Sequence, residues 1–201
     1  MRFIMIQAFL DSFKDLTPIL WASQICGLVG LVFIFISYQF KKKTYFILAS
    51  ISMLFFFLEQ ALAGLFANTI VTTGALIRNV VLAIYVCNGK EKSPDYFIYI
   101  LIGLVWISEF ILFITNGTIG IWDNYLPPIL WTIATVTSNH KNYYVLKLGM
   151  LVHEIGFLVY YAIYALPFSV MRQAILAASI IVSIIVMLIS KFKKSREKSA
   201  Q

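Results

Sequence analysis

Five ionisable side chains lie inside long apolar segments of this sequence: Glu59, Arg78, Glu109, His153 and Glu154. A charged side chain costs about 2.5–3.5 kcal/mol at the centre of a helix inserted into a bilayer, so such residues usually face the interior of a helical bundle. A low-dielectric interior cannot hold three unpaired carboxylates. We therefore expect the arginine to pair with one acid, and the other acids to be protonated or compensated by a cation.

These buried charges have two interpretations. In the first, Arg78 holds an anionic group of a solute, Asn79 hydrogen-bonds it, and His153 and Glu154 exchange protons during transport. In the second, an arginine–glutamate pair only stabilises the bundle. At about 1.5 Å of rise per residue, Glu59 and Glu109 lie in the outer half of the membrane and the other three ionisable groups near its midplane.

Lys147 and Arg172 also lie in apolar segments, but each is within about five residues of a predicted helix end. Their long side chains are therefore expected to reach the membrane interface. The first segment contains Ser23 and Gly27, four residues apart, which allow a close approach of another helix.

The sequence offers no catalytic or metal-binding pattern. His153 and Glu154 resemble the start of a zinc-protease motif, but the second histidine one helical turn later is missing. No Ser, His and Asp arrangement or glycine-rich phosphate loop occurs, and Cys26 and Cys87 lack the CxxC spacing of metal and redox sites. We expect no enzymatic activity, no cofactor and no metal.

The composition excludes a soluble domain. The chain of 201 residues is 61% hydrophobic and 12% charged, with a mean hydropathy of +0.87. A spanning helix needs roughly 20 residues, so the chain predicts an all-α membrane protein of about seven transmembrane helices. They are expected at residues 19–40, 44–66, 67–87, 96–115, 125–139, 142–166 and 168–191.

Basic residues follow the first, third, fifth and seventh segments, which places the N-terminus outside and the C-terminus inside. The net charge of +7 thus reports membrane orientation and predicts no nucleic-acid partner. The fifth segment is the shortest and contains Pro127 and Pro128, yet the charge bias favours a span there. Its threonines and serine predict a buried helix.

The predicted membrane domain covers residues 18–192. Residues 1–17 predict an amphipathic helix in the membrane interface. Residues 193–201 form a basic tail that either anchors the last helix or binds anionic lipids, at about 1 kcal/mol per charge.

A faint internal repeat appears at an offset of about 98 to 100 residues. It matches Lys43-Thr44-Tyr45 with Lys141-Asn142-Tyr143, and Asn68-Thr69 with Phe168-Ser169. The segments then divide into a first repeat at 18–88, a linking helix at 96–115 and a second repeat at 121–192. This parallel 3-1-3 arrangement is similar to that of the sugar-efflux (SWEET) and PQ-loop carriers.

Four short motifs resemble the YgjV-type bacterial inner-membrane proteins: QICG at 24–27, LFFFLEQALAG at 54–64, ALIRN at 75–79 and LPPI at 126–129. The resemblance covers roughly residues 20 to 190 and implies a multi-pass protein of the bacterial cytoplasmic membrane. The family is generally uncharacterised. It often has His at the position of Glu59, and the PQ dipeptide of the PQ-loop carriers is replaced by the Pro127-Pro128 pair.

Our leading hypothesis is a carrier that moves a small polar or organic solute through a site between two three-helix halves, with proton coupling left open. The alternative is a membrane protein that does not transport and instead binds lipid or a partner protein. The sequence indicates neither the substrate, the coupling ion, the direction nor the oligomeric state.

Overall fold

The computed structural model describes residues 17–62, 66–120, 122–163 and 167–199, and all regular structure in them is helical. The α-helices are α2 (Pro18–Ser37), α3 (Lys42–Leu62), α4 (Phe66–Cys87), α5 (Asp95–Thr115), α6 (Leu126–Ser138), α7 (Tyr143–Ile163) and α8 (Pro167–Ser199), and a 3-10 helix η1 (Trp122–Tyr125) precedes α6. The predicted interfacial helix at 1–17 lies outside the described residues except for Thr17.

Local signals explain several helix ends. The Thr17 hydroxyl caps α2 by accepting a hydrogen bond from the Leu20 amide at 3.4 Å, and Pro18 occupies the first helical position, where its missing N–H costs nothing. Gly89 and Gly117 follow α4 and α5 with φ values of 74° and 66°, a left-handed conformation that favours glycine.

In the described part of the chain, six helices are long and apolar enough to cross a membrane: α2, α3, α4 from Thr69, α5, α7 and α8 between Val170 and Lys191. They identify a helical membrane protein with several spans. Helix α6 has 13 residues and a length of about 20 Å, shorter than the roughly 30 Å hydrocarbon core. The predicted fifth span is therefore a short apolar helix, Leu126–Ser138.

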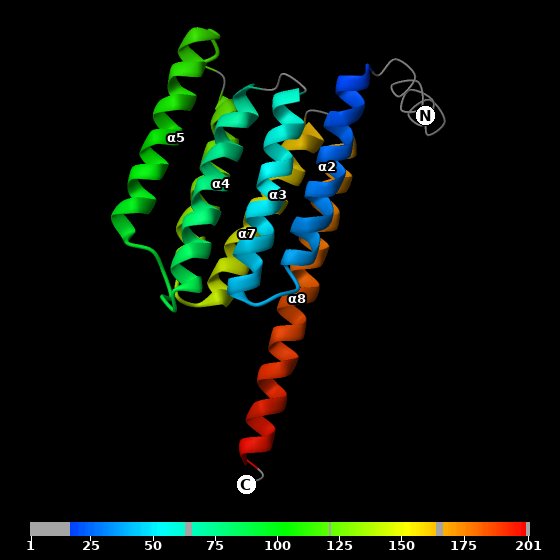
Figure 1. Ribbon diagram of the computed structural model, residues 1–201, viewed down its shortest axis with the longest axis vertical. Coiled ribbons are helices and arrows are strands. Elements are labelled where there is room, and N and C mark those ends of the chain that lie inside the picture. The colour runs from blue at the N-terminus through cyan, green and yellow to red at the C-terminus, as the bar shows by residue number, and fades with distance from the viewer. Residues whose placement is uncertain (1–16, 63–65, 121, 164–166, 200–201) are drawn as a thin grey trace.

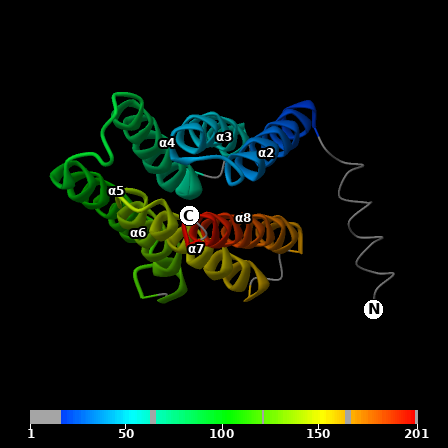
Figure 2. The ribbon, with the colours of Figure 1, turned by 90° about the horizontal axis from the view of Figure 1, so that it is seen from below.

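The helices form two rows (Figures 1 and 2). Helices α2, α3 and α4 pack against one another in chain order, and so do α6, α7 and α8. Helix α5 contacts α4 and α6 at one edge, while α2 meets α8 and α4 meets α6 across the two rows.

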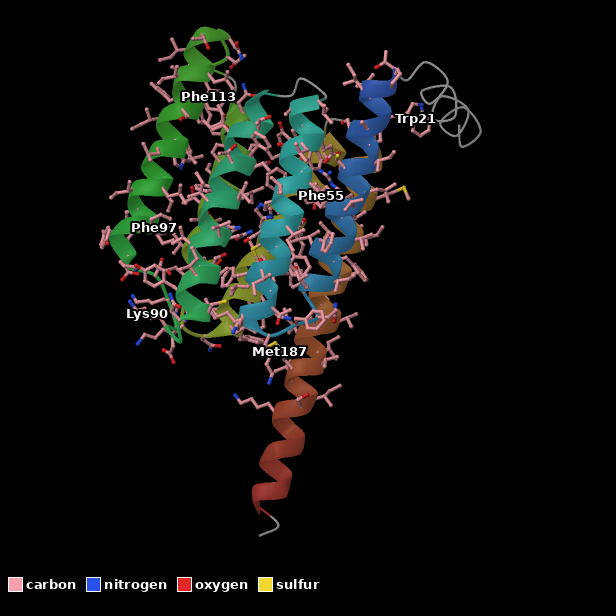
Figure 3. The ribbon with its side chains drawn as sticks, in the orientation of Figure 1. Trp21, Phe55, Lys90, Phe97, Phe113 and Met187 are labelled. Atoms are coloured by element: carbon pink, nitrogen blue, oxygen red, sulfur yellow. The ribbon has the colours of Figure 1, made fainter. Side chains whose placement is uncertain are left out.

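One end of the bundle, which we call the basic end, holds the connections 38–41, 88–94 and 139–142 and the emerging part of α8 (Figure 1). Lys90 lies there in Figure 3, whereas Trp21 and Phe113 lie toward the opposite, distal end. The Lys42 ammonium ties the three connections together, because it donates to the carbonyl oxygens of Glu91 and His140.

The first two helices approach each other closely, as the spacing of Ser23 and Gly27 predicted. The Ser23 hydroxyl donates to the Glu59 carbonyl oxygen at 2.8 Å, and a Cβ atom on Gly27 would collide with the Glu59 carboxylate. This contact fixes Glu59 against α2.

Helix α8 extends well beyond the other helices (Figure 1). It has 33 residues and a length of about 50 Å, and it leaves the bundle near Met187 in Figure 3. Residues 193–199 of the predicted basic tail continue this helix.

Candidate functional site

A cavity of about 120 Å³ lies between the two rows of helices. Its walls come from α2, α3, α4, α6, α7 and α8, and no residue of α5 lines it. The lining reaches Gln60, Tyr161 and Arg172, each within about two turns of the distal end of its helix. The cavity therefore extends from the middle of the bundle toward the distal end.

Tyr38 and Glu154 form the floor of the cavity. The Tyr38 hydroxyl donates to Glu154 Oε1 at 2.8 Å, and both side chains are buried. His153 also lines the cavity, with its Nδ1 3.5 Å from the same carboxylate oxygen. Two of the predicted site residues are thus held together on α7 and connected to α2.

Arg78 lies beside this floor and is only 2% exposed. Its Nε donates to Asn79 Oδ1 at 3.1 Å, and an NH1 hydrogen is donated to Thr135 Oγ1 at 3.1 Å. The predicted ion pair between Arg78 and a buried acid is not found among the described residues. Neutral acceptors, an amide and a hydroxyl, orient the guanidinium instead.

Arg172, in the distal part of the cavity wall, belongs to an ion pair that the sequence did not predict. An NH1 of Arg172 lies 3.7 Å from Glu59 Oε2, and the guanidinium carbon lies 5.4 Å from the centre of the Phe56 ring. These contacts hold Arg172 against α3, while its side chain remains 26% exposed, so the expectation that it reaches the membrane interface stays a prediction. The candidate residue Glu59 is therefore charge-paired and does not itself line the cavity.

The same expectation is wrong for Lys147, which is 1% exposed. Its ammonium donates to the Tyr38 carbonyl oxygen and to the Ser183 hydroxyl. That carbonyl lies just past the end of α2, where main-chain oxygens have no partner one turn ahead in the helix. The Tyr38 carbonyl oxygen therefore gives the Lys147 ammonium a polar partner inside the protein.

Further side-chain bonds join the end of α2 to α7 and α8. Gln39 Nε2 donates to Ser179 Oγ at 2.8 Å, and the Tyr143 hydroxyl donates to the Phe40 carbonyl oxygen. We call these contacts, together with those of Lys147, the basic-end clamp; its members are Tyr38, Gln39, Phe40, Tyr143, Lys147, Ser179 and Ser183.

Large buried side chains fill the bundle beside the clamp. Tyr45, Leu82, Leu146 and Ile180 are each 0% exposed, belong to one core cluster and do not line the cavity. Each lies on its helix between the level of the cavity floor and the basic end. The cavity is therefore closed toward the basic end.

Glu109 is separated from this site. It lies on α5, is 3% exposed, and its Oε1 has no hydrogen-bond partner in the described part of the chain. Of the six candidate residues, Arg78, His153 and Glu154 line the cavity, and Asn79 positions Arg78.

The cavity wall also contains polar groups that were not predicted from the sequence. Gln60 Oε1, Gln173 Oε1 and Trp131 Nε1 are buried in its walls without a hydrogen-bond partner among the described residues. The signal that could have found the two glutamines is an uncharged amide inside an apolar run, because such a group also needs a partner in lipid. These atoms leave hydrogen-bonding capacity for a bound solute or water.

Comparisons with known proteins give no relative to add to this description: no family model, curated protein or solved structure matches the chain.

Proposed function

We propose that this protein is a small multi-pass membrane carrier whose solute binds in the cavity between the α2–α4 and α6–α8 rows. The observation that supports the proposal is a polar, charged cavity in a bundle that is closed at its basic end. Burying the charged side chains of Arg78 and Glu154 costs considerable free energy, yet the two do not form an ion pair with each other. A bundle that needed these charges only for stability would be expected to pair them directly.

The arrangement of the helices supports the carrier architecture. Each row consists of three helices that are consecutive in the chain, and α5 connects the two rows. Tyr45 and Tyr143, equivalent residues in the internal repeat, have ring centres 6.2 Å apart. A two-fold relation between parallel halves brings equivalent positions together near its axis, so this contact favours a 3-1-3 repeat with α6 as a seventh crossing.

We also propose that the protein lies in the bacterial cytoplasmic membrane, belongs to the YgjV-type family and has its basic end in the cytoplasm. Support comes from the sequence motifs and from the gathering of lysines at one end of the bundle. In this orientation the cavity extends toward the outside. His153 and Glu154 would bind and release a proton as the cavity changes its exposure, which is the proton-coupled form of the proposal.

The test is a thermal-shift screen of detergent-purified protein against sugars, vitamins, nucleosides, amino acids and lipids at acidic and neutral pH. A solute that binds only the folded state raises the unfolding temperature. Hits are then measured for uptake into proteoliposomes. We expect a hit that is taken up by the unaltered protein and lost in Arg78→Ala, but kept in Glu109→Gln, which alters a buried side chain outside the cavity. Binding and uptake that survive Arg78→Ala in folded protein would refute this site.

A second function is favoured by one observation, the extension of α8 beyond the bundle to Ser199. This arm would present the basic residues to anionic lipid or to a partner protein. Deletion of residues 193–201 separates the two functions, because a carrier keeps its solute response and a binder loses its partner. Stabilisation by anionic lipids alone, abolished by the deletion, would favour the binder.

A further inference from the structure

The chemistry of the cavity indicates what kind of solute it accepts, and this inference rests on the proposed carrier function. Arg78 uses two of its N–H groups in bonds to Asn79 and Thr135. A guanidinium has five such donors, so the face toward the cavity retains donors for a carboxylate. The solute is therefore expected to carry an anionic group at one end.

Glu154 supplies the opposite charge in the same cavity. Its Oε1 accepts a hydrogen bond from the Tyr38 hydroxyl, and Oε2 forms no ion pair among the described residues. A carboxylate can accept about four hydrogen bonds, so it retains acceptor capacity for an ammonium group. The basic side chain beside it is His153, whose Nδ1 lies 3.5 Å from Oε1.

The size of the cavity limits the solute to a few atoms. An engineered cavity of about 150 Å³ holds benzene, so 120 Å³ corresponds to a molecule of about five or six non-hydrogen atoms. Gln60, Trp131 and Gln173 each have a buried polar atom without a hydrogen-bond partner among the described residues. These atoms favour a polar molecule over a hydrocarbon of that size.

We infer that the cavity between the two helix rows binds a small zwitterionic α-amino acid of the size of glycine or alanine, with its carboxylate on Arg78 and its ammonium group on Glu154. Such a molecule compensates both buried charges at once. A simple anion would leave Glu154 without a cationic partner unless His153 were protonated, and a simple cation would leave Arg78 without an anionic one.

Four probes of nearly equal size test the inference on the purified full-length chain: alanine, alaninamide, propionate and propionamide. They carry both charges, only the positive charge, only the negative charge and no charge. We expect alanine to bind at least about tenfold more tightly than each of the others, since each lost contact removes a hydrogen bond to a charged group. Binding is measured by calorimetric titration or by thermal shift at neutral pH.

Variants assign the contacts. Glu154→Gln should reduce the affinity for alanine toward that for propionate, and Arg78→Lys should weaken alanine and propionate together. Glu109→Gln, the same chemical change at a buried acid outside the cavity, should leave all four affinities unchanged. If Glu154→Gln does not fold, the comparison of the four probes on the unaltered protein still decides the inference.

Three results would overturn it. Propionate that binds as tightly as alanine would show that the ammonium group is not recognised. If a larger solute bound in an Arg78-dependent manner and alanine did not, the amino-acid assignment would be refuted and the carrier function would still stand. No Arg78-dependent solute in the whole screen would remove the carrier proposal as well.

Discussion

Tyr38 and Glu154, 116 residues apart in the chain, meet in a hydrogen bond of 2.8 Å between α2 and α7. The bond connects the two rows of helices directly at the floor of the cavity. On its far side from the cavity, the carbonyl oxygen of the same tyrosine accepts from Lys147 and Ser183. Tyr38 therefore links the cavity, through its hydroxyl, to the basic-end clamp, through its carbonyl oxygen.

Tyr38→Phe should destabilise the protein by about 1–3 kcal/mol, because the buried Glu154 oxygen loses its donor. Tyr45→Phe is the matched control: both tyrosines are 0% exposed and their rings stack, but the Tyr45 hydroxyl has no hydrogen-bond partner among the described residues. Its removal should be neutral or stabilising. Thermal unfolding in detergent gives the comparison, and equal losses in the two variants would contradict the assigned bond.

Gly149→Ala should destabilise the α6–α7 contact by about 1–3 kcal/mol, because the added methyl group would overlap the side chain of Thr137. The control is Gly103→Ala on α5, where an added Cβ meets nothing within 4 Å. There the better helix propensity of alanine should raise stability by up to about 1 kcal/mol. A tolerated Gly149→Ala in the same unfolding measurement would mean that α6 and α7 are farther apart than described.

Lys42→Met should loosen the basic end, because its ammonium joins the 88–94 and 139–142 connections through carbonyl oxygens. Exchange of the backbone amide hydrogens in both connections should accelerate by about two- to tenfold. The smaller value applies if solvent screens the ammonium strongly. Lys43→Met is the control, since Lys43 is exposed and adjacent. Equal acceleration in the two variants would assign the effect to general loss of charge.

Cysteine labelling tests the orientation. In a background with Cys26 and Cys87 replaced by serine, Lys43→Cys should react with a membrane-impermeant maleimide only after the cells are opened. Thr118→Cys, between α5 and η1, should react in intact cells. The two positions lie at opposite ends of the bundle. Labelling in the reverse order would place the basic end outside and reverse the direction in which the cavity extends.

The sequence predicted the buried charges more reliably than their partners. Arg78, His153 and Glu154 stand out because ionisable groups in apolar runs are costly, and the structure places all three around one cavity. Their actual contacts depend on which helices become neighbours. The bond from Tyr38 could not be predicted, since an aromatic residue near a segment end normally indicates the membrane interface.

Lys147 shows the limit of a rule based on distance from a helix end. The rule considers the reach of the side chain toward water and takes no account of main-chain acceptors inside the protein. The Tyr38 and Phe40 carbonyl oxygens lie at the C-terminal end of α2, where main-chain oxygens lack intrahelical partners, and they accept hydrogen bonds from side chains of the second row. Which side chains reach these oxygens depends on which helices pack against this end of α2, so the basic-end clamp could not be predicted from the sequence.

The last predicted segment ends at residue 191, where the part of α8 that is long and apolar enough to cross a membrane also ends. Hydropathy ends the final segment at residue 191, but α8 continues to Ser199 because lysine, arginine and glutamate are good helix formers in water. Hydropathy reports where the membrane ends and gives no information on where the helix ends.

The continuation of α8 changes how its basic residues meet their surroundings. A rigid helix rises about 1.5 Å per residue, so position 198 stands roughly 10 Å farther along the axis than position 191. Electrostatic attraction in cellular salt decays over a screening length of about 8 Å. If the arm keeps the direction of the bundle, lipid headgroups attract mainly its first turn. In the proposed orientation, the outermost turns would therefore lie in the aqueous phase, beyond the reach of the headgroup charges.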